Sequence, residues 1–241
     1  MSELNVKRTH DKEIYLKEDR YAQPKEYFKV IAGLMQESGV MQKGSRICDV
    51  GCAAGEFLYY LVEQFPMAQF YGYDIVEDLL VKARGKVPRA VFEHGSVLDR
   101  NLLEGESFDV IFLLGVHQIF DEFETCIGNV LSWLRKGGRA YIIGLFNPFP
   151  IDVWVKYRLV DDPDRLHREP GWNMFSKESV SRFLAGQDVK FNFHPFEMPF
   201  DLLPSEGDLV RTWTFANGDG QRLLTNGLSI LCNIEILEIE R

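Results

Sequence analysis

Between residues 46 and 145 the sequence alternates short apolar runs with segments in which apolar residues recur at helical spacing. Phe108–Leu114 is apolar without alternation, which is typical of a strand covered on both faces. Strands and helices that alternate at this period form βαβ units, so the pattern predicts a parallel sheet. The expected strands are residues 46–50, 69–74, 90–93, 108–114 and 139–145, with helices near 57–65, 76–84 and 123–134 between them.

The N-terminal part departs from this rhythm and suggests how the chain is divided. Residues 1–23 are largely polar and lack a clean period, so we expect an arm that orders over a ligand. Residues 24–241 are expected to form a single domain. It opens with an amphipathic helix from Pro24, a residue that suits the first turn of a helix.

The last third of the chain also breaks the alternation. Residues 146–175 contain four prolines and no clean period. A helix is expected from Lys177, followed by two long strands near 190–202 and 228–238. Between those strands, Asn217–Gly220 has the composition of a hairpin turn.

Charge and cysteine content limit the classes of partner. A formal net charge of −9 repels a phosphate backbone at long range, which argues against a polynucleotide substrate. The four cysteines form no CxxC pair, and no His/Cys cluster completes a zinc set, so we expect reduced thiols and no metal. No apolar run reaches the roughly 18 residues of a membrane span. A cytoplasmic protein with no membrane partner is expected, while the oligomeric state stays open.

A loop of small residues follows the first expected strand, in the segment ICDVGCAAGEF (Ile47–Phe57). Small residues let a ligand approach the backbone, and the following helix N-terminus offers free N–H groups. Asp49 stands at the strand end, and Asp74 ends the next strand, where a nucleotide-binding βαβ unit places its ribose-binding acid. The alternative is a tight turn that binds nothing.

The loop does not fit a dinucleotide or a triphosphate. A dinucleotide fingerprint that starts at Gly51 needs glycine or alanine at its third position, where this chain has Glu56. A carboxylate there would repel a pyrophosphate, and no GKS or GKT follows as in a P-loop. Acids beside the loop favour a cationic ligand instead.

The segment DVGCAAG resembles the first motif of class I S-adenosylmethionine-dependent methyltransferases, an acid followed by GxGxG, with Ala53 at the middle glycine. YGYDIVEDLL, HGSVLD, FDVIFLLG and LRKGGRAYI are similar to the later motifs in their usual order, so the match covers about residues 24–145. The resemblance implies an α/β fold with a Rossmann-like, seven-stranded, mostly parallel sheet, helices on both faces and an antiparallel last strand. It also implies S-adenosylmethionine as the cofactor.

The family's cofactor contacts carry over to strand ends of this chain. The resemblance implies that Asp49 attracts the positive end of the methionine moiety, Asp74 accepts from the ribose hydroxyls and Ile75 packs on the adenine. The other implied cofactor-binding residues are Gly51, Cys52, Ala53 and Gly55 in the loop, Ser96 and Val97 at the adenine edge, and Leu114 and Gly115 beside the sulfonium.

The groups that would act on an acceptor are less sharply defined. His117 follows the fourth expected strand, where a general base would serve a hydroxyl acceptor; a loop histidine without that role is the alternative. Residues 146–175 follow the fifth strand and are the expected acceptor-binding lid. Its candidate acceptor contacts are Phe146, Trp154, Tyr157 and Trp172, with simple packing of the lid as the alternative.

These features favour O-methylation of a small-molecule or carbohydrate-like acceptor. The C-terminal strands look similar to those of small methyltransferases for bacterial surface glycans and secondary metabolites. Methylation of nitrogen or carbon on a small metabolite is the alternative, whereas the intact loop and second acid disfavour a non-catalytic binding protein. The fourth motif reads LLGV rather than Asn-Pro-Pro-Tyr, which disfavours N-methylation of nucleic acid.

Overall fold

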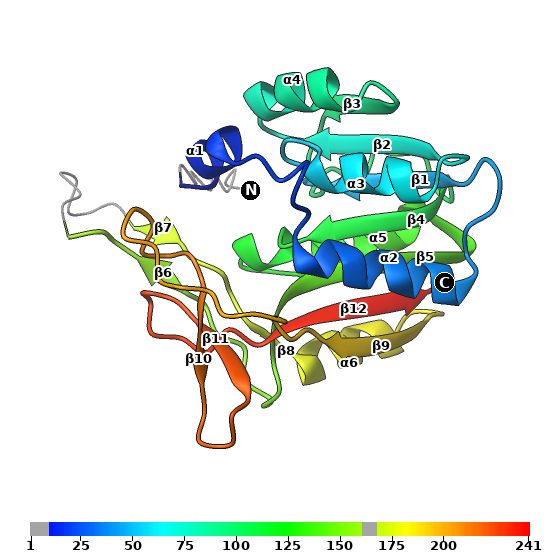
Figure 1. Cartoon of the computed structure of the whole chain (residues 1–241). Coiled ribbons are helices and arrows are strands. Elements are labelled where there is room, and N and C mark those ends of the chain that lie inside the picture. The colour runs from blue at the N-terminus through cyan, green and yellow to red at the C-terminus, as the bar shows by residue number, and fades with distance from the viewer. Residues whose placement is uncertain (1–9, 161–167) are drawn as a thin grey trace.

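A central, mostly parallel sheet organises the computed structural model of the chain, which describes residues 10–160 and 168–241 (Figure 1). Seven strands follow in the order β3-β2-β1-β4-β5-β12-β9, and the short strand β8 pairs with β5 off this path. The strands of this sheet are β1 (Arg46–Val50), β2 (Gln69–Asp74), β3 (Ala90–His94), β4 (Phe108–Leu114), β5 (Leu134–Asn147), β8 (Phe175–Ser176), β9 (Lys190–Pro195) and β12 (Ile234–Glu240).

The strand directions confirm the predicted sheet. β1 to β5 pair in parallel, whereas β12 runs antiparallel to both of its neighbours, β5 and β9. The last two strands are shorter than predicted, because β9 ends at Pro195 and β12 starts at Ile234. Pro195 and Pro199 have no amide hydrogen to donate to a neighbouring strand, so the chain leaves the sheet there.

Helices cover both faces of the sheet, because alternate residues of a strand point to opposite sides. In β4, Ile111 and Leu113 pack in one cluster with α5 and α6, whereas Val110 and Phe112 pack in another with α2, α3 and α4. The helices are α1 (His10–Lys17), α2 (Glu26–Ser38), α3 (Glu56–Gln64), α4 (Glu77–Lys86), α5 (Glu124–Trp133), α6 (Lys177–Ala185) and the short 3₁₀-helix η1 (His117–Ile119). None of the helices described is both long and apolar enough to cross a membrane.

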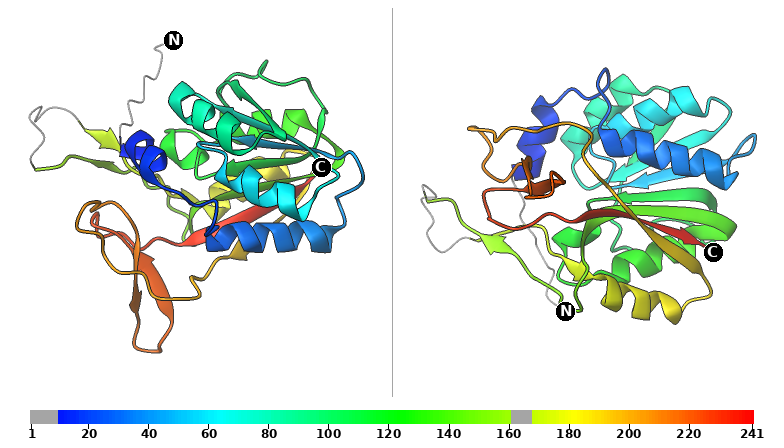
Figure 2. Two further views of the ribbon diagram at one scale, coloured as in Figure 1. Left: turned by 45° about the horizontal axis from the view of Figure 1, so that its top comes forward. Right: turned by 60° about the horizontal axis from the view of Figure 1, so that its bottom comes forward.

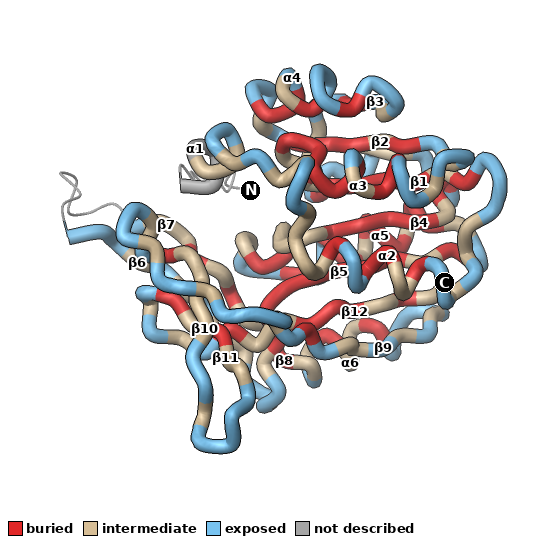
Figure 3. The backbone as a smooth tube through the Cα atoms, in the orientation of Figure 1, coloured by how far each residue is buried: buried red, intermediate tan, exposed pale blue. Residues whose placement is uncertain are grey.

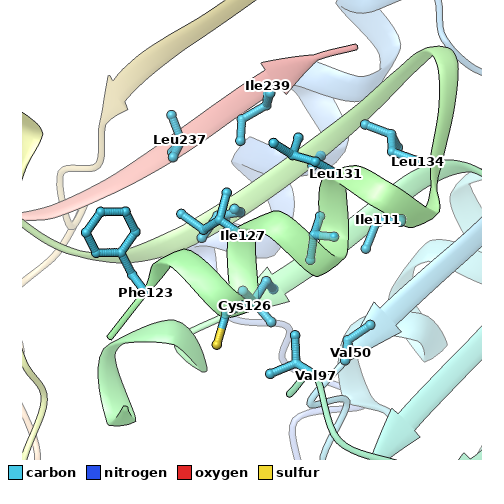
Figure 4. Close-up of a cluster of buried hydrophobic side chains, with 14 of the residues drawn as sticks. Val50, Val97, Ile111, Phe123, Cys126, Ile127, Leu131, Leu134, Leu237 and Ile239 are labelled. Carbon is cyan, nitrogen blue, oxygen red and sulfur yellow. The ribbon is translucent and has the colours of Figure 1, made fainter. Parts of the chain in front are cut away.

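The larger of the two clusters lies between α5 and the sheet (Figure 4). Phe123, Ile127 and Leu131 approach Ile111 of β4 and Leu237 of β12. Burial of each such side chain contributes about 1.5–3 kcal/mol relative to leaving it exposed. The four cysteines of the chain are buried and free, in agreement with the expectation of reduced thiols. Packing in this core holds β1, β4 and β5 in place, and the loops that follow the ends of the parallel strands form the candidate site described below.

The irregular parts of the chain extend beyond the carboxyl ends of the parallel strands (Figures 1 and 2). They include α1, the ribbon of β6 (Lys156–Tyr157) and β7 (Glu169–Pro170), and the hairpin of β10 (Trp213–Ala216) and β11 (Arg222–Thr225). The hairpin turn lies at Asn217–Gly220 as predicted. The tip of the hairpin is exposed, whereas the central strands are largely buried (Figure 3).

Candidate active site

The glycine loop joins β1 to α3 through backbone conformations that favour glycine. Gly51 and Gly55 have φ of +83° and +75°, in the left-handed region. A Cβ on Gly51 would overlap the side chain of Val116, and a Cβ on Gly55 would lie 2.9 Å from the ring of Phe92. Ala53, which replaces the family's middle glycine, also adopts a positive φ of 46°. The loop therefore requires small residues for steric reasons.

Asp74 connects this loop to the end of β2. Its Oδ2 accepts a hydrogen bond of 2.8 Å from the amide of Ala53, and its Oδ1 accepts one of 2.9 Å from the amide of Val76. Burial raises the pKa of Asp74, and the backbone N–H groups of Val76 and Ala53 oppose that rise. The carboxylate thus lies beside the loop, where the sequence placed a ribose-binding acid.

Asp49 is a buried acid whose Oδ1 has no hydrogen-bond partner among the described residues. Burial, followed by the nearby charge of Asp74, raises the pKa of Asp49 to about 8. A buried carboxylate without a partner is unfavourable, and a cation brought beside it would relieve that cost. The position therefore suits the cationic end of a ligand.

The other predicted cofactor positions differ in exposure. Ile75 is exposed, so its side chain is accessible to an adenine ring. Ser96 is half-buried and its Oγ accepts from the amide of Leu98 at 3.2 Å. Cys52 and Val97 are buried, and the side chain of Val97 packs in the core cluster of α5. Val97 would thus meet a ligand through its backbone rather than its side chain.

A cavity of about 750 Å³ lies next to these strand ends. Leu114 and Gly115, at the end of β4, line it, and so does Trp172. Most of its wall comes from two segments that sequence reasoning did not assign to an acceptor: residues 14–29 and residues 196–234. The two prolines of the run MPFDLLP (residues 198–204) were a signal for the second segment, because proline disfavours the strand predicted near 190–202.

Three of the four aromatic residues predicted for the acceptor do not line this cavity. Phe146 is fully buried in the core. Trp154 is half-exposed, and its indole N–H donates to the carbonyl of Asp121 at 3.0 Å. The Tyr157 hydroxyl donates to Glu169 of the β6–β7 ribbon at 3.2 Å. Of the four predicted acceptor contacts, only Trp172 lines the cavity. Residues 161–167 of the expected lid lie outside the described part of the chain.

His117 lies in the core rather than on the cavity wall. Its ring is fully buried and stacks on Phe146, with ring centroids 5.3 Å apart. Neither ring nitrogen has a hydrogen-bond partner in the described residues, and burial lowers the pKa of His117 to about 3. The next residue, Gln118, lines the cavity instead, while its Oε1 accepts from the amide of Leu145. In this arrangement the imidazole does not line the cavity.

The segment before α2 lies across the glycine loop. The Tyr21 hydroxyl donates to the carbonyl of Ala54 at 2.6 Å, and the amide of Arg20 donates to Glu56 at 3.1 Å. Lys82 of α4 donates to the carbonyl of Glu18 at 2.6 Å. Glu56, whose carboxylate argued against a dinucleotide in the sequence, thus has a structural role: it binds the backbone of the arm. The predicted arm is placed over the carboxyl ends of the strands.

Comparison with known proteins agrees with this geometry. Residues 41–171, more than half of the chain, match a family model described as a methyltransferase domain. The chain belongs to this methyltransferase family. The resemblance to class I S-adenosylmethionine-dependent methyltransferases is thereby confirmed. The YcgJ protein of Bacillus subtilis shares the fold with a TM-score of 0.59, at 15% identity over 88% of this chain and 99% of that one.

Curated relatives of this methyltransferase-family chain match only in part. A trans-aconitate 2-methyltransferase of Variovorax paradoxus is 28% identical over 98 residues, which are 41% of this chain and 38% of that protein. A probable nicotinate-nucleotide adenylyltransferase of Baumannia cicadellinicola is 26% identical over 111 residues, 46% of this chain and 48% of that protein. The chain therefore spans less than half the length of these relatives.

The burial of His117 predicts a specific acid sensitivity. Its pKa is about 3 in the folded chain and about 6.5 when exposed, so between these values only the unfolded chain binds the proton. Stability should therefore fall as the pH drops below 6.5. At pH 5 this one residue should lower the free energy of unfolding by about 2 kcal/mol relative to pH 8.

Urea denaturation at pH 5 and pH 8 measures this effect. In His117→Leu the loss between the two pH values should shrink by about 2 kcal/mol. In Gln187→Leu, which introduces the same side chain at an exposed position without a titratable group, the loss should stay at the wild-type value. An unchanged pH dependence in His117→Leu would show that the imidazole is solvated or partnered in solution.

Proposed function

We propose that this chain transfers a methyl group from S-adenosylmethionine to an oxygen of a small-molecule acceptor bound in the 750 Å³ cavity. The observation that carries the proposal is the position of Leu114 and Gly115. They end β4 beside the glycine loop, and they also line the cavity. One end of the cavity thus meets the expected cofactor position, and its volume is in the range of small-molecule sites.

The residues present fit this cofactor. The partnerless Oδ1 of Asp49 would face its ammonium group, Asp74 would hold the ribose, and the small residues of the loop would let the ligand approach the backbone. When bound, S-adenosylmethionine supplies a methyl group that is already activated by a sulfonium. The chain's own residues then need to orient the acceptor and exclude water, and orientation is a large part of such catalysis.

The cavity wall is suited to that task. Trp172, Phe196, Met198 and Phe200 provide apolar surface, and the start of α2 adds Tyr27 and the helix-capping residue Lys25. Burial raises the pKa of Tyr27 to about 12. The hydroxyls of Tyr27 and Tyr15, followed by the carboxylates of Glu18 and Glu56, raise the pKa of Lys25 against the effect of burial. Both groups are therefore protonated at neutral pH and neither acts as a base. An acceptor oxygen that is already ionised requires no base, which favours a carboxylate or a similar acidic oxygen.

The partial relatives support the same direction. Trans-aconitate, named in one of them, is a carboxylic acid whose oxygens are ionised at neutral pH. Adenylyl transfer is the competing activity, since the other relative carries that name. It would require a nucleoside triphosphate beside Asp49, Asp74 and Glu56, and a group of acidic side chains is a poor environment for phosphates. Methyl transfer is therefore the better proposal.

Direct binding and product analysis test this proposal. Calorimetry should show that S-adenosylhomocysteine binds, while NAD and ATP do not. Mass spectrometry should then detect a mass gain of one methyl group when the protein and S-adenosylmethionine are incubated with organic acids, phenols, sugars and amines. Methylation of amines alone would favour the N-methylation alternative. Binding of ATP without binding of S-adenosylhomocysteine would contradict the proposal.

Asp74→Ala should weaken S-adenosylhomocysteine binding by about 1.5–3 kcal/mol, the scale of a charge-assisted hydrogen bond. It also removes the acceptor of the Ala53 and Val76 amides, so the melting temperature should fall. Asp74→Asn keeps one acceptor oxygen and should lose less stability. Asp219→Ala, at the exposed hairpin turn, serves as the control. An unchanged dissociation constant in Asp74→Ala would place the ribose elsewhere.

Cofactor binding should release a proton from Asp49. The ligand-free carboxyl has a pKa of about 8, and a bound ammonium group would lower it. Affinity for S-adenosylhomocysteine should therefore rise by up to about tenfold per pH unit from pH 6 to pH 8 and then level off. Calorimetry at pH 7 in buffers of different ionisation enthalpy should measure the released proton.

Asp49→Asn separates this effect from other titrations. The amide carries no charge, so the variant should bind S-adenosylhomocysteine at least about tenfold more weakly, lose the proton release and show a flat affinity between pH 6 and pH 8. It should also unfold at higher temperature than the wild type at pH 8, because the buried unpaired charge is gone. Equal pH profiles for the two proteins would sink the assignment of Asp49.

A further inference from the structure

The cavity contains an unbalanced group of charges centred on Glu18. Three cations surround this one carboxylate: Arg20 Nη2 lies 3.1 Å from Oε1, Lys25 Nζ lies 4.0 Å from Oε2, and Arg211 Nη2 forms a short ion pair with Oε1. All four residues line the cavity. Three positive charges thus meet one negative charge, although the chain as a whole carries −9.

The cluster is assembled from two distant parts of the chain. Glu18, Arg20 and Lys25 belong to the segment that links α1 to α2, whereas Arg211 lies almost two hundred residues later, before β10. The segment carrying Glu18 is itself held on the protein, since Lys82 binds the carbonyl of Glu18 and Glu56 binds the amide of Arg20. The tertiary fold therefore directs these charges at the same part of the cavity.

The other charged groups at and behind the cavity wall leave an excess of positive charge. Glu56, behind the wall, also faces Lys25, but Lys82 faces Glu56 in turn, so these two charges cancel. Glu26 pairs with Lys29 at 2.6 Å, so that pair contributes no net charge. Oδ1 of Asp208 accepts from the backbone amides of Val210 and Arg211 at 3.2 and 3.1 Å. Even with Asp208 included, the wall keeps one excess positive charge, from Arg20, Lys25, Lys29 and Arg211 against Glu18, Glu26 and Asp208.

Partial burial of the cluster strengthens the effect of this excess positive charge. The Glu18 side chain is 13% exposed and that of Lys25 is 21% exposed, so water screens the cluster only in part. Burial by itself would raise the pKa of Glu18, yet Lys25, Arg20 and Arg211 outweigh it and hold the pKa below its usual range. A cluster with excess positive charge in a half-buried cavity is stabilised by a further anion.

We propose that Arg20, Lys25 and Arg211 form a subsite for a carboxylate of the methyl acceptor, and that Glu18 occupies this subsite until the acceptor displaces it. This inference rests on the proposed function and narrows the acceptor to an organic acid. Arginine binds carboxylates with two parallel hydrogen bonds, which suits two of the three cations. The apolar wall at Trp172 and Phe196 would cover the carbon skeleton of such an acid.

Glu18→Gln gives the sharpest test, because the proposal predicts a gain rather than a loss. Calorimetry would use the full chain saturated with S-adenosylhomocysteine. The probes are mono-, di- and tricarboxylates of three to seven carbons, trans-aconitate included, each paired with its methyl ester. At least one acid should bind more than tenfold tighter than its ester. Glu18→Gln should tighten that binding by about fivefold or more, because the internal competitor is neutral.

The cation variants should act in the opposite direction. Arg211→Gln and Arg20→Gln should each weaken binding of the acid by about tenfold or more, without changing binding of its ester. Arg222→Gln is the matched control, since Arg222 lies in the same C-terminal segment, pairs with Asp201 and does not line the cavity. That variant should bind the acid within twofold of the wild type. Inorganic phosphate, as a separate probe, shows whether the subsite also accepts a phosphate.

Three results would overturn the subsite. The first is that no acid binds more tightly than its ester, and the second is that phosphate binds and no carboxylate does. The third is that Glu18→Gln weakens acid binding and lowers the melting temperature, which would mean that the cluster only holds the arm in place. The proposed function fails differently: acids bind as predicted and no methylated product forms. Methylation of neutral acceptors at rates unaffected by Arg211→Gln would retain the function and reject the subsite.

Discussion

The carboxylate of Asp74 is the interaction on which the rest of the site depends. It accepts from the amides of Ala53 and Val76, so one side chain joins the glycine loop after β1 to the end of β2. The loop can make this turn because Gly51 and Gly55 adopt left-handed backbone beside Val116 and Phe92. Parallel strands end at the same edge of the sheet, so this anchored loop determines where a ligand can lie.

Unfavourable electrostatics are concentrated at the same edge. Asp49 is buried with a partnerless oxygen, and Glu18 is outnumbered by Arg20, Lys25 and Arg211. The first site lacks a cation and the second lacks an anion. A cationic cofactor and an anionic acceptor would relieve both at once, so the two halves of the proposed reaction are complementary in charge. The apolar core beneath, between α5 and the sheet, provides the rigidity that keeps these groups in place.

The strand ends could be predicted because their signals are local. An apolar run, a glycine loop and a following helix occupy consecutive residues, so the positions of Asp49 and Asp74 follow from spacing alone. The acceptor residues could not be predicted in this way. His117 and Gln118 are neighbours after β4, yet the first is buried against Phe146 and the second lines the cavity. Successive residues of η1 point in different directions, so only one of the two side chains can face the cavity. The packing of the folded chain determines which one does.

The sequence by itself determined the alternation of strands and helices, the methyltransferase motifs and the acids beside the loop, because each depends on residues close together in the chain. Only the tertiary structure decided which surfaces enclose the cavity. Residues 14–29 and 196–234 lie far apart in the chain, and they meet because α1 packs on α4 while Pro195 and Pro199 turn the chain out of the sheet. The pairing of Glu18 with Arg211 results from that packing. No local pattern encodes it, since long-range electrostatics become defined only when the chain is folded.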